Sequence, residues 1–243
     1  MFRGLGTIIN VIAIIVGGFI GMRGGSRLSV RARTLITDVL GCVTLLGAAD
    51  AAKNLWSKDF SANVPTGWTL LGTLAALLIG GLLGTALGIE DRLEAFGEKL
   101  KKRFGGEEHS FIAGFMAASL LFVIGPLAIL GSISDGMGTG ITQLVLKSTL
   151  DFFAAIAFAS TFGVGVMASA IPVGIYQALW TVVGLFLGNI MDGYQIAAMT
   201  TTGGILLFGI SLRLLGIKQM RIGDLLPALF LAPIVALIAH QFI

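Results

Sequence analysis

The sequence carries little charge for its length. Only 12% of its 243 residues are charged, whereas 56% are hydrophobic and the mean hydropathy is +0.95. Soluble domains contain about twice that charged fraction, and a globular core of this size could not hide so many apolar side chains from water. A lipid bilayer accepts apolar surface without penalty. The composition therefore excludes an ordinary soluble domain and predicts a protein whose main partner is the lipid bilayer.

Residues that carry most enzymatic and metal chemistry are also scarce. Cys42 is the only cysteine, which excludes an intramolecular disulfide, and the two histidines, His109 and His240, match no metal-ligand spacing. The chain contains no H-E-x-x-H or G-x-S-x-G motif and no nucleotide-binding motif. We therefore expect no metal, no cofactor and no enzymatic activity. The net charge of +3 comes from cations in short loops, so we expect no nucleic-acid partner.

Long apolar runs occupy most of the chain. A helix needs about twenty apolar residues to cross the hydrocarbon of a bilayer. The candidate spans are Leu5–Met22, Leu35–Leu55, Trp68–Ile89, Phe111–Ile133, Ile141–Gly163, Val166–Ile190, Ile196–Leu215 and Leu225–Phe242. The predicted fold is an all-α, polytopic transmembrane helical bundle of about eight spans, with residues 1–243 forming a single integral membrane domain. The sequence leaves open whether residues 163–172 form a re-entrant segment.

The loops between the spans predict the orientation of the chain. Cations gather after the first, third and seventh spans, in residues 23–33, 92–103 and 213–221. With about eight helices these loops fall on one side of the membrane, which the positive-inside rule makes cytoplasmic. The opposite side holds only three cations: Arg3, Lys53 and Lys58. Both termini are therefore predicted to lie outside.

Residues 91–106 have the pattern of a short amphipathic helix. Apolar residues recur there at helical spacing, opposite a face of Glu and Lys, and they are Leu93, Phe96, Leu100 and Phe104. Such a helix lies in the membrane interface with its apolar face buried. We expect a cytoplasmic connector, with a partner-binding helix as the alternative.

Two pairs of spans resemble one another. Superposing span one on span six and span two on span seven aligns Thr7 with Gly174, Asn10 with Gln177, Gly17 with Gly184, Gly21 with Gly188, Gly41 with Gly203 and Gly47 with Gly209. The copies begin on opposite membrane faces, which makes an inverted repeat, a design frequent in secondary transporters. Chance similarity between apolar segments is the alternative.

A stripe of small residues runs along the third span. Gly72, Ala76, Gly80, Gly84 and Gly88 recur every four residues. Such a stripe lets a neighbouring helix approach the backbone closely. We expect it to serve helix packing.

Two opposite charges lie inside the fifth span. A charge at the centre of a membrane helix costs about 2.5–3.5 kcal/mol on insertion scales. Lys147 and Asp151 are four residues apart, so they share a helix face and can pair, and Ser148 lies beside them. The same face continues with small residues: Ala155, Ala159 and Gly163. The pair either anchors the helix near its outer end or lines a polar cavity that binds a solute or an ion.

Other polar or helix-breaking residues extend the candidate site. Gly125 and Pro126 interrupt the fourth span, where a proline removes a helix hydrogen bond and predicts a hinge or a kink. Asp135 follows in a Gly-rich turn and could join the Lys147 region. The two aligned amides, Asn10 and Gln177, could face each other, either to bind solute or to form an inter-helix hydrogen bond.

Several motifs resemble those of a known family when taken in order. They are GTIIN, ASLLFVIGPLAILGSISDG, LKSTLDFFAAIAFAS, SAIPVGIYQ, GGILLFGISLRLLGIK and LLPALFLAP. Together they resemble a bacterial inner-membrane family of unknown function, DUF554. The resemblance covers essentially the whole chain and implies a multi-span protein of the bacterial cytoplasmic membrane with no assigned substrate. It places these residues at matching positions: Asn10, Asp135, Lys147, Ser148, Asp151 and Gln177.

The polar residues and the repeat together favour a secondary, ion-coupled transporter of a small polar or charged solute. Lys147 would neutralise an anionic group of the solute, and Asp151 would bind a coupling cation, Na⁺ or H⁺. The alternatives are a passive channel and a non-transporting membrane scaffold or accessory subunit. A channel usually lines its pore with rings of like groups, and this chain offers scattered single ones. The oligomeric state stays open, a homo-oligomer included.

Overall fold

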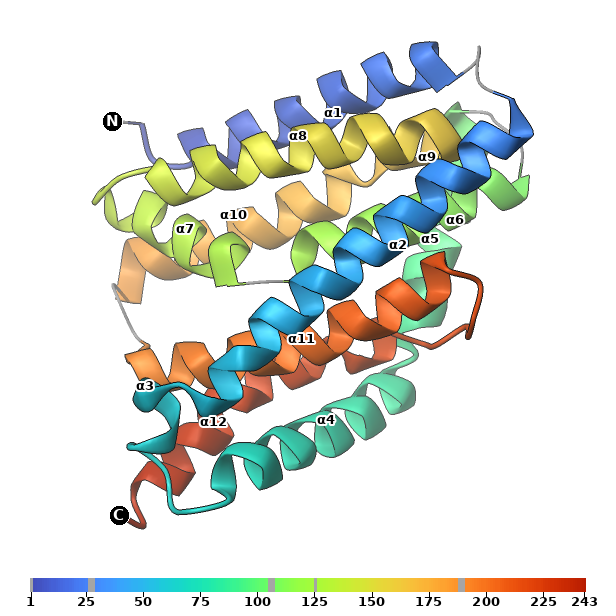
Figure 1. Ribbon diagram of the computed structural model, residues 1–243. Helices are drawn as coiled ribbons and strands as arrows, with labels where there is room; N and C mark the ends of the chain where they lie inside the picture. The colour runs from blue at the N-terminus through green and yellow to red at the C-terminus, as the bar shows by residue number, and fades with distance from the viewer. Residues whose placement is uncertain (1, 26–28, 105–107, 125, 188–190) are drawn as a thin grey trace. The chain divides into compact units, whose positions relative to one another are not determined.

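Helices make up all the regular structure that is described for this chain. The computed structural model describes residues 2–25, 29–104, 108–124, 126–187 and 191–243 (Figure 1). The longer helices are α1 (Leu5–Gly25), α2 (Val30–Ala52), α4 (Trp68–Leu87), α5 (Ile89–Phe104), α6 (Glu108–Val123), α7 (Pro126–Met137), α8 (Thr142–Phe162), α10 (Ala170–Leu187), α11 (Gly193–Leu214) and α12 (Pro227–His240). The short ones are η1 (Lys53–Trp56), α3 (Lys58–Ser61), α9 (Gly165–Ala168) and η2 (Gly223–Leu225).

Most of these helices are long and apolar enough to cross a bilayer. In the part of the chain that is described, seven helical segments meet the requirements of length and hydropathy, and α6 with α7 adds an eighth if this bent pair is one span. A helix satisfies its own backbone hydrogen-bonding groups, which hydrocarbon cannot do. The prediction of a polytopic helical bundle with about eight spans is confirmed.

The fourth predicted span consists of two helices. The segments 110–123 and 127–137 are bent by 60° relative to each other. Of the two residues predicted to form the hinge, Gly125 lies outside the described residues and Pro126 is the first residue of α7. A proline is tolerated at this position because the N–H it lacks would have no partner within the helix.

The sixth predicted span contains two helices. Gly163 ends α8 with a φ of 72°, a conformation that favours glycine, and α9 begins two residues later. Ser169 separates α9 from α10, and residues 165–186 together meet the requirements of length and hydropathy for one span.

The chain divides into two compact units, which are described separately. Unit 1 comprises residues 1–40, 93–123 and 127–190, and unit 2 comprises residues 41–92, 124–126 and 191–243. Helices α2 and α5 contribute residues to both. The predicted organisation as one integral membrane domain stays a prediction.

Four helices of unit 1 form a closed ring. Helix α1 packs on α8, α8 on α6, α6 on α10, and α10 on α1. Figure 1 shows α1 lying alongside α8 over most of its length. Thr7 contacts Thr181 and Val11 lies against Gly174, so α1 and α10 run antiparallel. Side chains that point to the middle of this ring are removed from lipid by a helix on every side.

The backbones of α1 and α8 are in direct contact. A Cβ atom on Gly17 would lie 2.5 Å from the carbonyl oxygen of Phe152, and one on Gly21 would overlap the backbone of Ile156. The Cβ of Ala155 would lie 3.2 Å from a Cβ atom on Gly17. The small face predicted on the fifth span therefore accommodates α1 over this stretch and leaves no space for a solute there.

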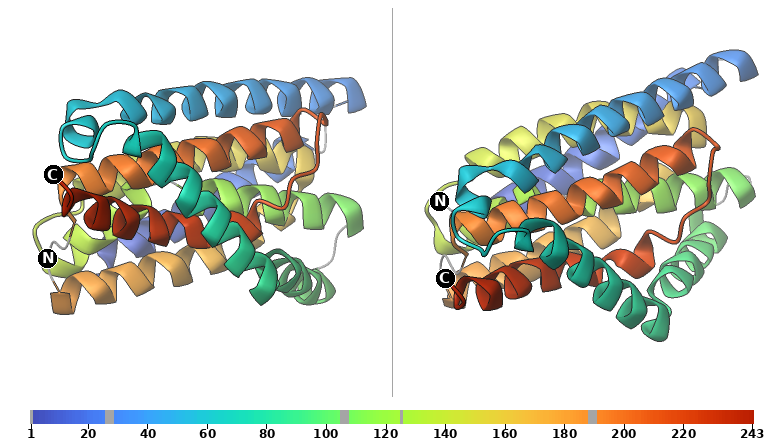
Figure 2. Two further views of the ribbon diagram at one scale, coloured as in Figure 1. Left: turned by 90° about the horizontal axis from the view of Figure 1, so that it is seen from below. Right: turned by 60° about the horizontal axis from the view of Figure 1, so that its bottom comes forward.

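In unit 2, α4 and α12 pack through the predicted stripe of small residues. Figure 2 shows α4 crossing α12. A Cβ atom on Gly80 would lie 2.5 Å from the backbone nitrogen of Ala228, and one on Gly84 would overlap the backbone of Asp224. Helix α11 packs on α12 and on α4. The stripe serves helix packing, as predicted.

The amphipathic segment is helical, and its apolar face packs on α6. The structure gives α5 the bounds Ile89–Phe104, two residues earlier than predicted. The rings of Phe96 and Phe115 meet edge to face with centroids 6.1 Å apart, and Gly97 lies against the same Phe115 ring. This contact within the chain favours the connector over the partner-binding helix. Its cytoplasmic location and the inverted repeat stay predictions.

The contact between α1 and α8 predicts a large difference between two glycines of α1. We expect Gly21→Ala to lower the free energy of unfolding by about 1–3 kcal/mol, because neither backbone can move away easily. Gly24→Ala is the matched control, since nothing lies within 4 Å of a Cβ atom there. Thermal unfolding of the detergent-purified protein would measure both. Equal melting temperatures for the two variants would contradict the proposed packing.

Candidate functional site

A buried ion pair lies halfway along α8. Asp151 is the tenth of the 21 residues of this helix, and Lys147 lies one turn earlier on the same face. The Lys147 ammonium donates a hydrogen bond to Oδ2 of Asp151, and the two side chains are only 7% and 9% exposed. The predicted pairing is therefore observed. The pair lies inside the helix, and its role, as an anchor of the helix or as part of a polar cavity, stays a prediction.

Asn10 joins the pair from α1. Its Nδ2 donates a hydrogen bond of 2.9 Å to the same Oδ2 of Asp151. A carboxylate can only accept, which fixes the orientation of the amide and leaves its oxygen, Oδ1, pointing elsewhere. That oxygen is buried and has no hydrogen-bond partner. The amide nitrogen of Asn10 thus has a hydrogen-bond partner, whereas its amide oxygen, an acceptor, has none.

Helix α6 contributes an aromatic ring to the surroundings of Lys147. The ammonium lies 5.8 Å from the centroid of the Phe122 ring, within the range of a cation–π interaction. Ser119 lies three residues before Phe122 and so on the same face of α6. Its hydroxyl is buried and has no partner. Sequence reasoning missed both residues, although Ser119 is the only polar side chain in the run AASLLFV.

Gln177 completes the cluster from α10. It is fully buried, and neither its amide oxygen nor its amide nitrogen has a hydrogen-bond partner. The contacts of Thr7 with Thr181 and of Val11 with Gly174 place Gln177 level with Asn10 across the α1–α10 pair. The two amides make no hydrogen bond to each other, so the predicted inter-helix bond between them is not observed.

These five residues, Asn10, Ser119, Lys147, Asp151 and Gln177, are called the polar core below. Each of the four helices of the ring contributes at least one of them, and all are buried. An unsatisfied polar group in hydrocarbon costs several kcal/mol. Buried polar groups in proteins almost always have a partner, so the free amide and hydroxyl atoms make the polar core the candidate site of this chain.

Two predicted site residues lie apart from the polar core. The Ser148 hydroxyl donates to the carbonyl oxygen of Leu144 in its own helix, at 2.6 Å. Asp135 accepts hydrogen bonds from the backbone nitrogens of Gly4 and Gly6, at 3.1 and 2.9 Å. Its carboxylate therefore neutralises the positive N-terminal end of α1 and does not pair with Lys147. Both residues have structural partners.

A cavity lies in unit 1 near the C-terminal ends of α1 and α8. It encloses about 230 Å³ and is lined by Met22, Gly25, Arg33, Ser110, Phe111 and residues 159–164. Arg33 is the only charged side chain among the described residues of this lining, and its Nε is buried without a partner. One amino group of the guanidinium donates to the carbonyl oxygen of Gly25, at 3.1 Å. Ala159 in the lining lies eight residues from Asp151, about 12 Å along α8.

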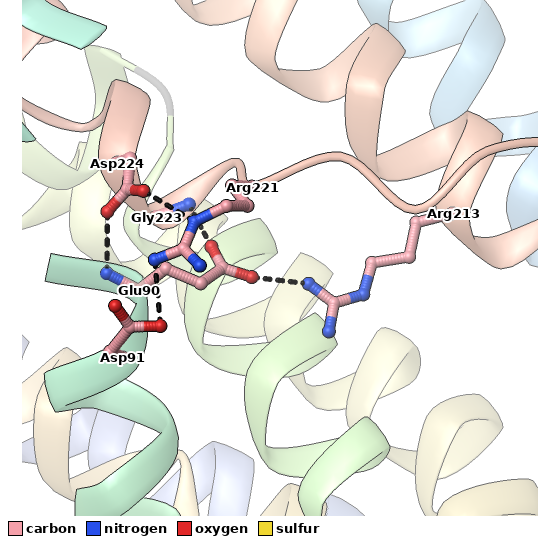
Figure 3. A network of polar contacts seen from close by, with 6 residues as sticks. All are labelled: Glu90, Asp91, Arg213, Arg221, Gly223 and Asp224. Atoms are coloured by element: carbon pink, nitrogen blue, oxygen red, sulfur yellow. Dashed lines mark hydrogen bonds and ion pairs between the residues drawn. The ribbon is translucent and has the colours of Figure 1, made fainter. Parts of the chain in front are cut away.

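Unit 2 contains a separate network of charges. Glu90 is buried at the start of α5 and accepts hydrogen bonds from Arg213 at 2.8 Å and from the backbone nitrogen of Gly223 at 2.5 Å (Figure 3). Asp224 in turn accepts from the backbone nitrogen of Glu90, at 2.9 Å. The network joins the start of α5 to the segment that follows α11, and the residues it connects all belong to unit 2. Its donors and acceptors are paired, which makes it structural.

Arg221 closes this network from the solvent side. It pairs with Asp91 at 2.8 Å and with Asp224 at 2.7 Å. The hydrogen bond to Asp91 and then that to Asp224 raise the pKa of the Arg221 guanidinium above its usual value. It therefore stays charged at any physiological pH. Sequence reasoning counted Arg213 and Arg221 as loop cations and missed their carboxylate partners.

The arrangement in unit 1 suits reversible binding of a polar species. It combines one charge of each sign with amide and hydroxyl groups that have free hydrogen-bonding capacity. Among the described residues, no three Asp, Glu, His or Cys side chains come together as a metal site would require. The polar core therefore offers electrostatic and hydrogen-bonding recognition.

The fold and the polar core define an integral membrane protein of the polytopic helical class, with charges kept inside one helical bundle. The chain belongs to a family described as "Protein of unknown function (DUF554)", whose model matches residues 5–237. The family resemblance expected from the motifs is thus confirmed.

Two relatives match over nearly their whole length. The "Uncharacterized membrane protein YdfK" of Bacillus subtilis (strain 168) is 29% identical over 237 residues, which cover 98% of this chain and 97% of that protein. The "Uncharacterized protein YqgA" of Escherichia coli (strain K12) is 30% identical over 233 residues, covering 94% of each chain. No solved structure matches the chain. The comparisons show a multi-pass membrane protein of unknown function.

The ion pair predicts that the loss of one partner destabilises the protein strongly, and that the loss of both partners destabilises it less. We expect Lys147→Met to lower the free energy of unfolding by about 3–5 kcal/mol, because Asp151 would remain as an uncompensated buried charge. The double variant Lys147→Met/Asp151→Leu should recover part of this loss, since it buries no charge. Unfolding of the purified proteins in detergent would measure both values. A double variant as unstable as the sum of its single variants would contradict the pairing.

The network in unit 2 predicts a similar loss from Glu90. In Glu90→Ala the buried Gly223 nitrogen and Arg213 lose their acceptor, and we expect a loss of about 3–5 kcal/mol in unfolding free energy. Glu94→Ala, one turn further along α5 at an exposed position, is the control and should change stability little. Thermal unfolding compares the two. A Glu90 variant as stable as the Glu94 variant would show that the network does not hold the loops.

Proposed function

We propose that the protein is a secondary, ion-coupled transporter of a small polar or charged solute, and not an enzyme. The observation that carries this proposal is the polar core. Four apolar helices surround one ion pair together with three residues, Asn10, Ser119 and Gln177, that bear buried and unpaired polar atoms. A purely structural bundle would gain stability by replacing these residues with apolar ones. Intramembrane ionisable residues of this kind mark solute and ion pathways.

The position of the polar core fits alternating access. Asp151 lies midway along a helix of membrane-spanning length, where transporters of this class bind their solutes. Helix α6, which carries Phe122 beside Lys147, is followed by the bend into α7. Broken helices of this type line binding sites in transporters and absorb the movement that opens them. We assign the bend, with Pro126 at the start of α7, as the hinge.

The inverted repeat supports the same proposal. Its predicted copies include α1 and α10, which run antiparallel side by side and carry the aligned amides Asn10 and Gln177 at the same level. Two copies related by an axis in the membrane plane would have this arrangement. By the charge of the loops we place the protein in the bacterial cytoplasmic membrane, with both termini outside.

Transport measurements test the proposal directly. Purified protein would first be screened by thermal unfolding against inorganic anions, carboxylates, amino acids, nucleobases and alkali cations. A ligand at about a hundred times its dissociation constant adds roughly 2.7 kcal/mol to the stability of a protein that binds it only when folded. The stabilising solute would then be followed into proteoliposomes.

We expect solute flux to fall at least about tenfold in Lys147→Ala and in Asp151→Asn, because each loses one charge of the polar core. Thr201→Val is the matched control. Thr201 also has a buried hydroxyl without a partner, but it lies in unit 2, outside the polar core. Unchanged flux in both polar-core variants would overturn the assignment of the site. Solute-independent single-channel currents would replace the carrier by a channel.

A further inference from the structure

The amide of Asn10 and the carboxylate of Asp151 make one of the two hydrogen bonds that join a carboxylic acid and an amide in a cyclic pair. In the observed state one bond exists, from Nδ2 of Asn10 to Oδ2 of Asp151, at 2.9 Å. The remaining oxygen of the amide, Oδ1 of Asn10, is buried and makes no hydrogen bond with any described residue. The bonds from Asn10 and from Lys147 both end on Oδ2 of Asp151, and neither uses the second carboxylate oxygen, Oδ1. The two Oδ1 atoms are acceptors, so they cannot bond to each other without a proton between them.

A proton on Asp151 would supply the missing bond. The O–H that forms on Oδ1 of Asp151 can donate to Oδ1 of Asn10, while the existing bond from Nδ2 to Oδ2 is kept. The result is a two-bond acid–amide pair in which every polar atom of Asn10 is satisfied. The orphan oxygen of Asn10 is thus placed to stabilise the protonated carboxyl group specifically.

Protonation of Asp151 also changes the state of Lys147. Among the described residues, the carboxylate of Asp151 is the one anionic partner of the ammonium. Once that carboxylate is neutral, Lys147 is a single positive charge inside the ring of helices, which is costly in a medium of low polarity. A small anion would restore neutrality. The unpaired donor atoms nearby, the Gln177 amide nitrogen and the Ser119 hydroxyl, could complete its hydrogen bonds.

We propose that the polar core carries a small carboxylate-type anion together with one proton, with Asp151 and Asn10 holding the proton and Lys147 binding the anion. This inference rests on the proposed transporter function and names the solute class and the coupling ion. The step is balanced: the Lys147–Asp151 pair, one proton and one anion give a Lys147–anion pair and a neutral Asp151. No other bond is made or broken.

Electrostatics alone then couples the binding of the anion to the binding of the proton. The empty polar core has no net charge, because Lys147 and Asp151 cancel. The core with both proton and anion bound has no net charge either. Binding the proton alone leaves one positive charge and binding the anion alone leaves one negative charge. Each of these half-loaded states has an unpaired charge inside the membrane, which raises its free energy. The protein therefore changes conformation only when the polar core is empty or fully loaded.

The neighbouring titratable groups have other partners or lie far away. Lys147 and Asp151 are the only ones in α8. In α7, Asp135 is held by the backbone of Gly4 and Gly6. In α10, Tyr176 packs edge-on against Trp180, with ring centroids 6.4 Å apart.

The remaining charges of the helices around α8 lie near helix ends. In α1, Arg23 stacks on Phe19, thirteen residues or about 20 Å beyond Asn10, and Arg3 precedes the helix and is exposed. The acid and the histidine of α6 are its first two residues, also about 20 Å along that helix from Phe122. Helix α9 has no titratable residue. Protonation at the polar core therefore concerns Asp151.

The pH dependence of anion binding tests the inference on the whole protein. Lactate and pyruvate serve as probes, with their affinity measured by thermal stabilisation from about pH 5 to about pH 8. Where empty Asp151 is ionised, affinity should fall about tenfold for each unit of rise in pH, because one proton binds with each anion. In proteoliposomes an inward lactate gradient should acidify the interior at a rate that a clamped membrane voltage does not alter. Protein-free liposomes correct for passive entry of the acids.

Variants separate the proton site from the anion site. Asp151→Asn imitates the protonated acid, so it should bind lactate independently of pH and lose proton-driven accumulation. Asn10→Leu should weaken lactate binding about tenfold at low pH, since the protonated acid loses its hydrogen bond to Oδ1 of Asn10. Lys147→Gln should abolish lactate binding. Thr201→Val should behave as the wild type.

The outcomes distinguish this inference from the proposed function. Lactate binding by the wild type that does not depend on pH would overturn the inference, as would transport of cations or neutral solutes in place of anions. Either result would leave a transporter that works through the polar core. A wild type that moves no solute of any class would overturn both.

Discussion

The direct contact between the backbones of α1 and α8 is the constraint on which the rest of unit 1 depends. Gly17 and Gly21 remove the side chains that would hold the two helices apart, and α1 then lies on the carbonyl groups of Phe152 and Ile156. Asparagine has the shorter of the two amide side chains. Asn10 can therefore reach the carboxylate of Asp151, at 2.9 Å, only because the two helices are so close. The packing of small residues and the chemistry of the polar core are therefore one property of the helix pair.

Low polarity gives the polar core its energetic significance. In water the Lys147–Asp151 pair would contribute little, because solvent screens both charges. Inside a ring of apolar helices the same pair is held in one geometry. A change in the charge of one residue must there be compensated by the other residue or by a bound solute. The orphan atoms of Asn10, Ser119 and Gln177 add sites where such a solute can be recognised. Stability and binding thus conflict at this place, as they commonly do at functional sites.

Unit 2 also combines glycine contacts between helices with buried carboxylates, but there these features stabilise the structure. Gly80 and Gly84 bring α4 against α12, and the carboxylates of Glu90 and Asp224 then accept hydrogen bonds from the opposing backbone and from arginines. In this network each carboxylate is paired with a cation. The contrast with unit 1 shows why buried charge alone does not identify a site: the unpaired polar atoms around the charge carry that information.

The sequence by itself determined the class of the protein. Apolar runs of about twenty residues in a chain with 12% charge fix helices that span a bilayer, because only that structure satisfies the backbone in hydrocarbon. The four-residue spacing also fixed the pairing of Lys147 with Asp151 and the packing role of the stripe in α4, since both follow from the geometry of a single helix. The family followed from the motifs.

What lay beyond one helix was decided only by the tertiary structure. Asp135 was expected near Lys147 but caps α1, and Ser148 is satisfied by the backbone of its own helix. Phe122 lies beside Lys147, although no spacing links the two residues. The carboxylate partners of Arg213, near the end of α11, and of Arg221, in the segment that follows, were missed for the same reason. Periodicity states which residues share a face of a helix, whereas the partner of that face depends on which helices meet and at what height. In this chain glycine contacts between distant segments set both.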